Sequence, residues 1–151
     1  MEEKIKEQLI DAIERGNKDQ VLSLIDKGID LNSRFLRGET PVHISAKNGA
    51  IEIMKVLIAA GAQTEIKDDL GLSPLHYAVR SGHLEVSTFL ASKADAVSCV
   101  DQWGSTPLHY AAKLGDPKIG SMLIFKGANV NQPDNAGWTP LHIAAAEGNE
   151  P

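Results

Sequence analysis

Apolar residues recur along this chain at helical spacing, in short stretches separated by polar, glycine-containing segments. Within 51–60, Ile53, Val56 and Leu57 lie three and four residues apart, and 84–93 repeats the arrangement. Such spacing places the apolar side chains on one face of a helix. The pattern predicts pairs of short amphipathic helices joined by polar turns.

The same pattern returns every 33 residues. The seven residues that begin at Thr40 have close counterparts that begin at Ser73, Thr106 and Thr139. Glycines keep the same step where each first helix should end: Gly16, Gly49, Gly82, Gly115 and Gly148. A fixed period of this length is typical of a solenoid, in which one structural unit stacks on the next.

Each unit carries its own start and stop signals. Thr106 can cap a helix, and Pro107 suits the first helical position, where its missing N–H is no loss. Gly115 can then end that helix in a left-handed conformation. The second helix of each unit should end in the same way, at Gly28, Gly61 and Gly127, but the equivalent residue of the third unit is Ala94. We expect Ala94 to be left-handed at some cost and the turn 93–96 to be the least regular.

The 33-residue period and the motif Thr106-Pro107-Leu108-His109-Tyr110-Ala111 resemble the ankyrin repeat, a β-turn followed by two antiparallel helices. The resemblance covers nearly the whole chain and implies an all-α solenoid of stacked helix-turn-helix units with β-hairpin turns. We expect one ankyrin-repeat domain over 1–151, made of a capping repeat 1–34, full repeats 35–67, 68–100 and 101–133, and a partial repeat 134–151. Because the fifth copy stops where its second helix should begin, we expect a fragment of a longer array.

Composition and charge exclude several classes of partner and location. The chain has 151 residues and a formal net charge of −5, so no overall positive field attracts nucleic acid or anionic lipid. No stretch approaches the roughly 18 apolar residues of a membrane span. The single cysteine, Cys99, excludes an intramolecular disulfide. We expect a cytoplasmic protein, with the nucleus as the alternative, that binds neither nucleic acid nor membrane.

Four histidines recur at the 33-residue step and raise the question of a metal site: His43, His76, His109 and His142. Stacked repeats lie roughly 8–10 Å apart, whereas metal ligands sit about 2.0–2.1 Å from one ion, so these residues cannot share a metal. The resemblance implies that they tie neighbouring turns together by hydrogen bonds. We find no catalytic motif and expect no enzyme, no catalytic residue, no cofactor and no metal, although a nucleophile at Cys99 is an alternative.

Hairpin tips and first helices are the surfaces that the resembled family generally uses for protein recognition. Trp103 and Trp138 stand at such tips, and aromatic side chains are favoured interface anchors. Lys47, Arg80 and Lys113 recur at 33-residue steps and should form a basic row. The predicted partner-binding residues are Leu36, Arg37, Lys47, Leu70, Leu72, Tyr77, Arg80, Trp103, Tyr110, Lys113 and Trp138. The alternative is that the aromatic residues pack internally and the basic ones are only solvated.

The sequence therefore predicts a protein-interaction module that binds an acidic and apolar surface of a partner protein through a concave groove and the hairpin tips. The alternative is a targeting or regulatory segment of a larger protein. Asn32 also lies in a context that resembles the ankyrin-repeat asparagines that are hydroxylated in animal cells, which makes it a candidate modification site.

Overall fold

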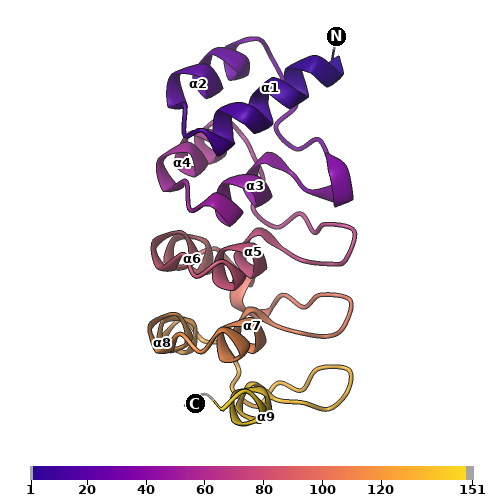
Figure 1. Cartoon of the computed structure of the whole chain (residues 1–151), viewed down its shortest axis with the longest axis vertical. Helices are drawn as coiled ribbons and strands as arrows, with labels where there is room; N and C mark the ends of the chain where they lie inside the picture. The colour runs from indigo at the N-terminus through magenta and orange to yellow at the C-terminus, as the bar shows by residue number, and fades with distance from the viewer. Residues whose placement is uncertain (1, 149–151) are drawn as a thin grey trace.

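The computed structural model describes residues 2–148, and over this range it forms nine α-helices and no β-strand. The helices are α1 (Glu2–Glu14), α2 (Lys18–Asp26), α3 (Pro41–Asn48), α4 (Ile51–Ala59), α5 (Pro74–Arg80), α6 (Leu84–Ala91), α7 (Pro107–Leu114), α8 (Pro117–Phe125) and α9 (Pro140–Ala146), with 3-10 turns η1 (Leu36–Gly38) and η2 (Ala96–Ser98). Consecutive helix pairs stack along one axis (Figure 1). The predicted all-α repeat solenoid is confirmed, whereas the predicted repeat boundaries stay a prediction.

Local capping explains where the first helices begin. The Thr40 side chain accepts a hydrogen bond from the backbone N–H of His43, and the His43 side chain accepts from the backbone N–H of Thr40. This reciprocal arrangement recurs at the start of α5, α7 and α9, each with proline in the first turn. The sequence signals at Thr40, Ser73, Thr106 and Thr139 are therefore real helix starts.

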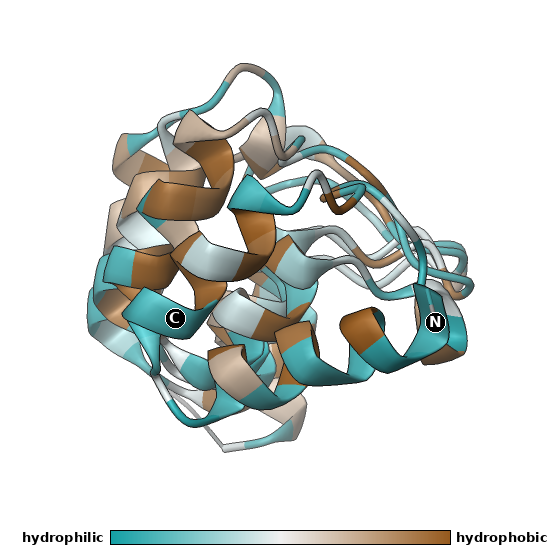
Figure 2. Cartoon of the chain, turned by 90° about the horizontal axis from the view of Figure 1, so that it is seen from above, coloured by the Kyte–Doolittle hydropathy of each residue, from teal (hydrophilic) through white to brown (hydrophobic). Residues whose placement is uncertain are grey.

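The helices form two layers with the core between them. The first helices α1, α3, α5, α7 and α9 make one layer, and α2, α4, α6 and α8 make the other (Figure 1). Leu9, Leu57, Leu75 and Ile119 are among the fully buried side chains. A view along the stack shows the hairpins projecting from the side of the first helices (Figure 2). Each hairpin consequently lies beside a first helix rather than over a second one.

Aspartate carboxylates build the second, third and fourth hairpins. Asp101 N–H donates to Ser105 C=O at 3.0 Å, and one oxygen of the Asp101 side chain accepts from the N–H groups of Trp103 and Ser105, both at 2.9 Å. Asp68 and Asp134 make the equivalent bonds in their own hairpins. The turn backbone is therefore held by a side chain within the turn.

Backbone hydrogen bonds also join successive hairpins, which we call the tip ladder. Its bonds are Asp69 N–H to Arg37 C=O (3.0 Å), Gln102 N–H to Leu70 C=O (3.0 Å) and Asn135 N–H to Trp103 C=O (2.9 Å). Glycine permits this close approach, because a Cβ at Gly71 would lie 2.8 Å from the backbone nitrogen of Gln102. Gly71 is also left-handed, with φ +83°. The ladder fixes the spacing of the hairpin tips.

The prediction that Ala94 is left-handed is wrong. Helix α6 ends at Ala91, and the left-handed residue is Asp95, with φ 60°, just before η2. Aspartate tolerates this conformation better than alanine because its short polar side chain can hydrogen-bond locally. The chain therefore delays the turn by one residue instead of straining Ala94.

Apolar side chains are uncovered at the α9 end of the stack. Leu141 of α9 is 56% exposed, whereas its counterpart in the preceding unit, Leu108 of α7, is 5% exposed. A pocket of about 270 Å³ lies here between α7, α8 and α9, and its walls include Leu141, Ile124 and Val130. One unit earlier, the fully buried Ile119 and other residues of α8 cover the equivalent positions.

The two leucines give a direct test of how burial depends on position in the stack. We expect Leu108→Ala to lower the free energy of unfolding by about 2–5 kcal/mol, because it leaves a cavity in a packed core. We expect Leu141→Ala to cost under about 1 kcal/mol, because most of that side chain is already in water. Urea unfolding followed by circular dichroism measures both. Equal losses would contradict the assignment of Leu141 to an uncovered face.

Candidate functional site

Three buried histidines join each unit to the next, and we call them the histidine bridges. His43 Nδ1 accepts from Thr40 N–H at 3.1 Å, so its Nε2 carries the hydrogen and donates to Leu72 C=O at 2.9 Å. Equivalent bonds connect His76 to Ser73 and Ser105, and His109 to Thr106 and Trp138. The predicted role of tying neighbouring turns together is confirmed for these three residues, whereas His142, the fourth of the series, caps α9 through Thr139.

Burial favours the neutral form of His43 and His76 by lowering their pKa values. It lowers the pKa of His76 to about 4, against the opposing effect of the bond to the Ser105 carbonyl. The pKa of His43 is also lowered, again chiefly by burial. Neutrality is required by the geometry, because Nδ1 can accept from the capping N–H only while it has no proton. Protonation of either imidazole at Nδ1 would break its hydrogen bond with the capping N–H.

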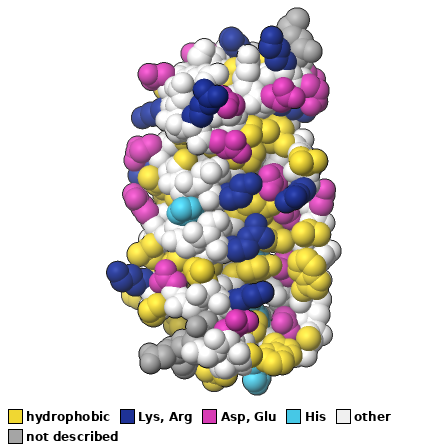
Figure 3. Space-filling view, viewed as in Figure 1, with side chains coloured by type: hydrophobic (Ala, Val, Ile, Leu, Met, Phe, Trp, Pro, Cys, Tyr) yellow, Lys and Arg dark blue, Asp and Glu magenta, His cyan; other side chains and the backbone are white. Residues whose placement is uncertain are grey.

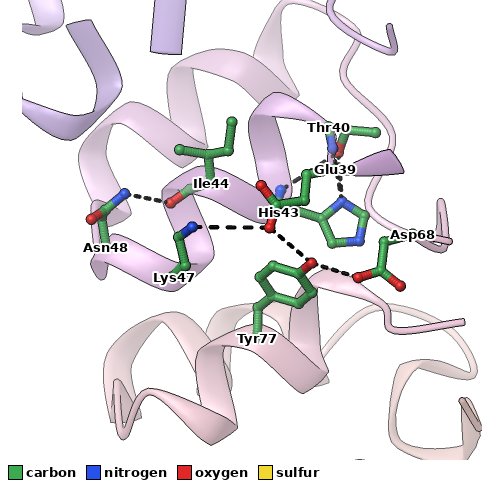
Figure 4. A network of polar contacts seen from close by, with 8 residues as sticks. All are labelled: Glu39, Thr40, His43, Ile44, Lys47, Asn48, Asp68 and Tyr77. Atoms are coloured by element: carbon green, nitrogen blue, oxygen red, sulfur yellow. Dashed lines mark hydrogen bonds and ion pairs between the residues drawn. The ribbon is translucent and has the colours of Figure 1, made fainter. Parts of the chain in front are cut away.

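Two tyrosines carry out a second internal task. The Tyr77 hydroxyl lies 2.5 Å from Asp68 Oδ2 and 3.0 Å from Glu39 Oε1, and Lys47 Nζ lies 3.9 Å from the same Glu39 oxygen (Figure 4). The ring also packs edge-on against His43 at 4.8 Å between centroids. Burial, followed by the Asp68 hydrogen bond, raises the pKa of Tyr77. Tyr77 therefore stays a neutral donor between two carboxylates.

The next unit repeats this pairing. The Tyr110 hydroxyl donates to Asp101 Oδ2, and the Tyr110 ring packs edge-on against His76 at 5.3 Å. Burial raises the pKa of Tyr110 as well, with the Asp101 hydrogen bond as the second cause. The hydroxyl thus secures the carboxylate that holds its own hairpin.

Two of the predicted partner-binding residues must be corrected. Tyr77 and Leu72 are each only 2% exposed, so neither offers a side chain to a partner. Tyr77 is enclosed by the contacts with Asp68 and Glu39. Leu72 is drawn inward where its carbonyl meets His43 and its N–H meets Asp68. Tyr110 is half-buried and keeps an accessible edge.

The other predicted residues are exposed, and most of them gather beside the hairpins. Trp103 is 51% exposed and Trp138 is 45% exposed, although the Trp138 ring also packs edge-on against His142 at 5.8 Å. Leu36, Arg37 and Leu70 are exposed at the first two hairpins. Large apolar side chains so placed have no role in the core.

The basic row, defined as Lys47, Arg80 and Lys113, lies on the exposed side of α3, α5 and α7. Dark blue side chains run down this face of the molecule (Figure 3). Lys47 is partly engaged with Glu39, and the Arg80 guanidinium stacks over the Tyr77 ring at 4.9 Å. Contacts within their own units therefore hold Lys47 and Arg80 in place on this exposed face.

The described residues contain no group of three or more histidine, cysteine or acidic side chains that could hold a metal ion. None of the helices in residues 2–148 is both long and apolar enough to cross a membrane.

Cys99 is half-buried and free. The candidate modification site Asn32 is held in place, since its Oδ1 accepts from Gln63 N–H at 2.8 Å.

A solenoid of helix pairs whose hairpins stack through a backbone ladder defines a helical repeat protein. A family model of ankyrin repeats in three copies matches residues 9–98 and 93–151, and the chain belongs to this family. Ankyrin repeats are generally protein-interaction modules, and the family is generally non-enzymatic.

Curated relatives match parts of the chain. It is 38% identical over 56 residues to the ankyrin repeat protein FPV219 of fowlpox virus (strain NVSL), covering 37% of this chain and 13% of that protein. It is 33% identical over 60 residues to the ankyrin repeat-containing protein P1E11.10 of Schizosaccharomyces pombe, covering 40% of this chain and 29% of that protein. The matches thus span less than a third of the length of these relatives.

The low pKa of His76 makes stability depend on pH. In the unfolded chain His76 takes up a proton near the ordinary pKa of 6.5, whereas in the folded chain it does so only near pH 4. We therefore expect the free energy of unfolding to be fully retained above that ordinary value. It should fall by on the order of 3 kcal/mol as the pH drops from there toward about 4. Urea unfolding across this pH range measures the effect.

Matched histidine variants separate this contribution from the rest of the chain. His76→Asn should flatten the pH dependence, whereas His142→Asn, at an exposed position, should leave it nearly unchanged. His43 continues to contribute in both variants. The same slope in both would show that bridging histidines do not govern acid stability.

Proposed function

We propose that this chain binds a partner protein through the groove between its hairpins and its first helices. The observation that carries the proposal is the exposure of Trp103 and Trp138 beside the basic row. An exposed aromatic side chain costs the free protein solubility and gives a partner a large, rigid contact. Charged and apolar groups together on one face favour a specific interface over a merely solvated one.

The charge of this face selects the chemistry of the partner. The chain as a whole has a formal net charge of −5, yet the basic row concentrates positive charge along the first helices. A surface with acidic side chains opposite the row and apolar ones opposite the tryptophans would complement it. The proposed partner-binding set is accordingly Leu36, Arg37, Lys47, Leu70, Arg80, Trp103, Tyr110, Lys113 and Trp138.

We place the protein in the cytoplasm, with the nucleus as the alternative compartment. The only cysteine in the sequence is free, which suits a reducing environment, where thiols are not needed for disulfides.

Charge reversal in the basic row tests the role of the groove. We expect Arg80→Glu/Lys113→Glu to abolish most partner capture and to weaken its dependence on salt, because like charges would now oppose the acidic partner. Affinity capture from cells that express the protein, read by quantitative mass spectrometry at low and physiological salt, measures the change.

A matched variant controls for total charge. Lys118→Glu/Lys126→Glu changes the net charge by the same amount but lies at α8, in the other helix layer. It should retain the partners that the chain captures. If both double variants lose or keep the same proteins, the groove is not the binding surface.

The tryptophans give a separate test. We expect Trp103→Ala/Trp138→Ala to lose captured partners while circular dichroism and thermal stability stay close to those of the unchanged chain. Both side chains are about half exposed, and only their backbone groups support neighbouring units. Capture that survives this change would move the binding surface away from the hairpins.

A further inference from the structure

A shallow cup of about 220 Å³ opens between the third hairpin, α7 and α9. We define the cup by the residues that line it: Trp103, Ser105, His109, Tyr110, Lys113 and Ile143. Its walls are mainly the exposed indole, the accessible edge of Tyr110 and the Ile143 side chain. Lys113 belongs to the basic row and is the cation in the wall.

The cup exists because two residues depart from the repeat. Ser105 stands where the preceding unit has Leu72, whose larger side chain is buried. Ile143 stands 33 residues after Tyr110, so the aromatic ring that borders the equivalent space one unit earlier is replaced by an aliphatic side chain. The hollow is consequently a property of this position in the stack and not of every repeat.

The hydrogen bonds of the residue at this position are the same in both units. Leu72 N–H donates to Asp68 and its C=O accepts from His43, and Ser105 makes the same two bonds with Asp101 and His76. Leu72 and Ser105 make both bonds with their backbone atoms, to the side chains of the aspartate and the histidine. The side chain of Ser105 takes no part in these two bonds, so it can be changed without removing them.

Size and polarity define what fits. Pockets for drug-sized ligands run to roughly 300–1,000 Å³, so this smaller space suits one side chain. Its aromatic and aliphatic walls favour an apolar side chain, because burying that surface on both sides removes it from water.

Charge defines what lies next to that side chain. Lys113 borders the cup. Arg80, the preceding member of the row, is near as well, because its positive charge acts to lower the pKa of Tyr110, against the larger effect of burial. The nearby Asp101 is buried, and its two oxygens are bonded to the hairpin and to Tyr110. The rim therefore presents cations, which favour a segment with acidic side chains.

We propose that the cup binds one bulky apolar side chain of an acidic segment in a partner protein, with a carboxylate of the same segment beside Lys113. This inference rests on the proposed function and adds the position and chemistry of the anchor. The contact with Trp103 and Ile143 supplies the affinity, and the contact with Lys113 fixes the direction in which the segment lies.

A displayed library of random peptides is the probe. Selection against the unchanged chain should enrich sequences that carry a bulky apolar residue next to aspartate or glutamate. Synthetic peptides of the winning sequences should lose about tenfold or more in affinity when the apolar residue is replaced by alanine. With Trp138→Phe, Trp103 is the only tryptophan left, and its fluorescence should shift on binding.

Ser105→Leu fills the cup with the side chain that the preceding unit already carries at this position, so folding should be preserved. The affinity of this variant for the selected peptides should be lower by about tenfold or more. Ser105→Ala keeps the cup open and should bind them as before. Enrichment no greater than on an unrelated protein, or equal affinity for both variants, overturns the proposal.

The charge variant separates the two ideas. Peptides that are lost with Arg80→Glu/Lys113→Glu but bind equally to Ser105→Leu would overturn the cup as the anchor site and leave the groove as the binding surface. Peptides that bind equally to both variants and to the unchanged chain would contradict the groove as well.

Discussion

The stack depends on one repeated interaction, in which a buried imidazole caps its own helix and holds the carbonyl of the next hairpin. His43, His76 and His109 each do this with Nε2–O distances of 2.9 Å. Since a buried carbonyl without a partner costs about 1–3 kcal/mol, removing one imidazole harms two units at once. Helix start, hairpin position and inter-unit spacing all meet at this side chain, which explains why the threonine, proline and histidine of the motif belong together.

The tyrosine and aspartate pairs extend this support to the hairpins and leave the outer residues free of it. Tyr77 and Tyr110 each bring a hydroxyl to the carboxylate that closes a hairpin, while the side chain of Trp103 is exposed beside them. In the fourth hairpin, Asp134 has no tyrosine opposite it, because Ile143 occupies that position. The same exchange that omits the internal bond opens the cup beside Lys113.

The architecture could be predicted because its causes repeat: a capping residue, a proline and a glycine at one step are readable without coordinates. The site was less predictable because it depends on what stands one unit away. Leu72 and Tyr77 look like surface residues in a linear reading, yet the contacts with His43 and Asp68 bury them. A usable signal did exist, since the chain pairs Asp68 with Tyr77 and Asp101 with Tyr110 nine residues later. The prediction for Ala94 was wrong for a different reason, because the left-handed residue of that turn is Asp95.

The tip ladder separates the shape of this molecule from the chemistry it displays. Its hydrogen bonds use only backbone atoms of Arg37, Leu70 and Trp103, whose side chains differ completely in size and charge. A cation, an aliphatic residue and an indole thus occupy equivalent places at no cost to the hydrogen bonding beneath them. Substitution at these positions can therefore alter what the stack displays and leave the ladder that spaces its hairpins unchanged.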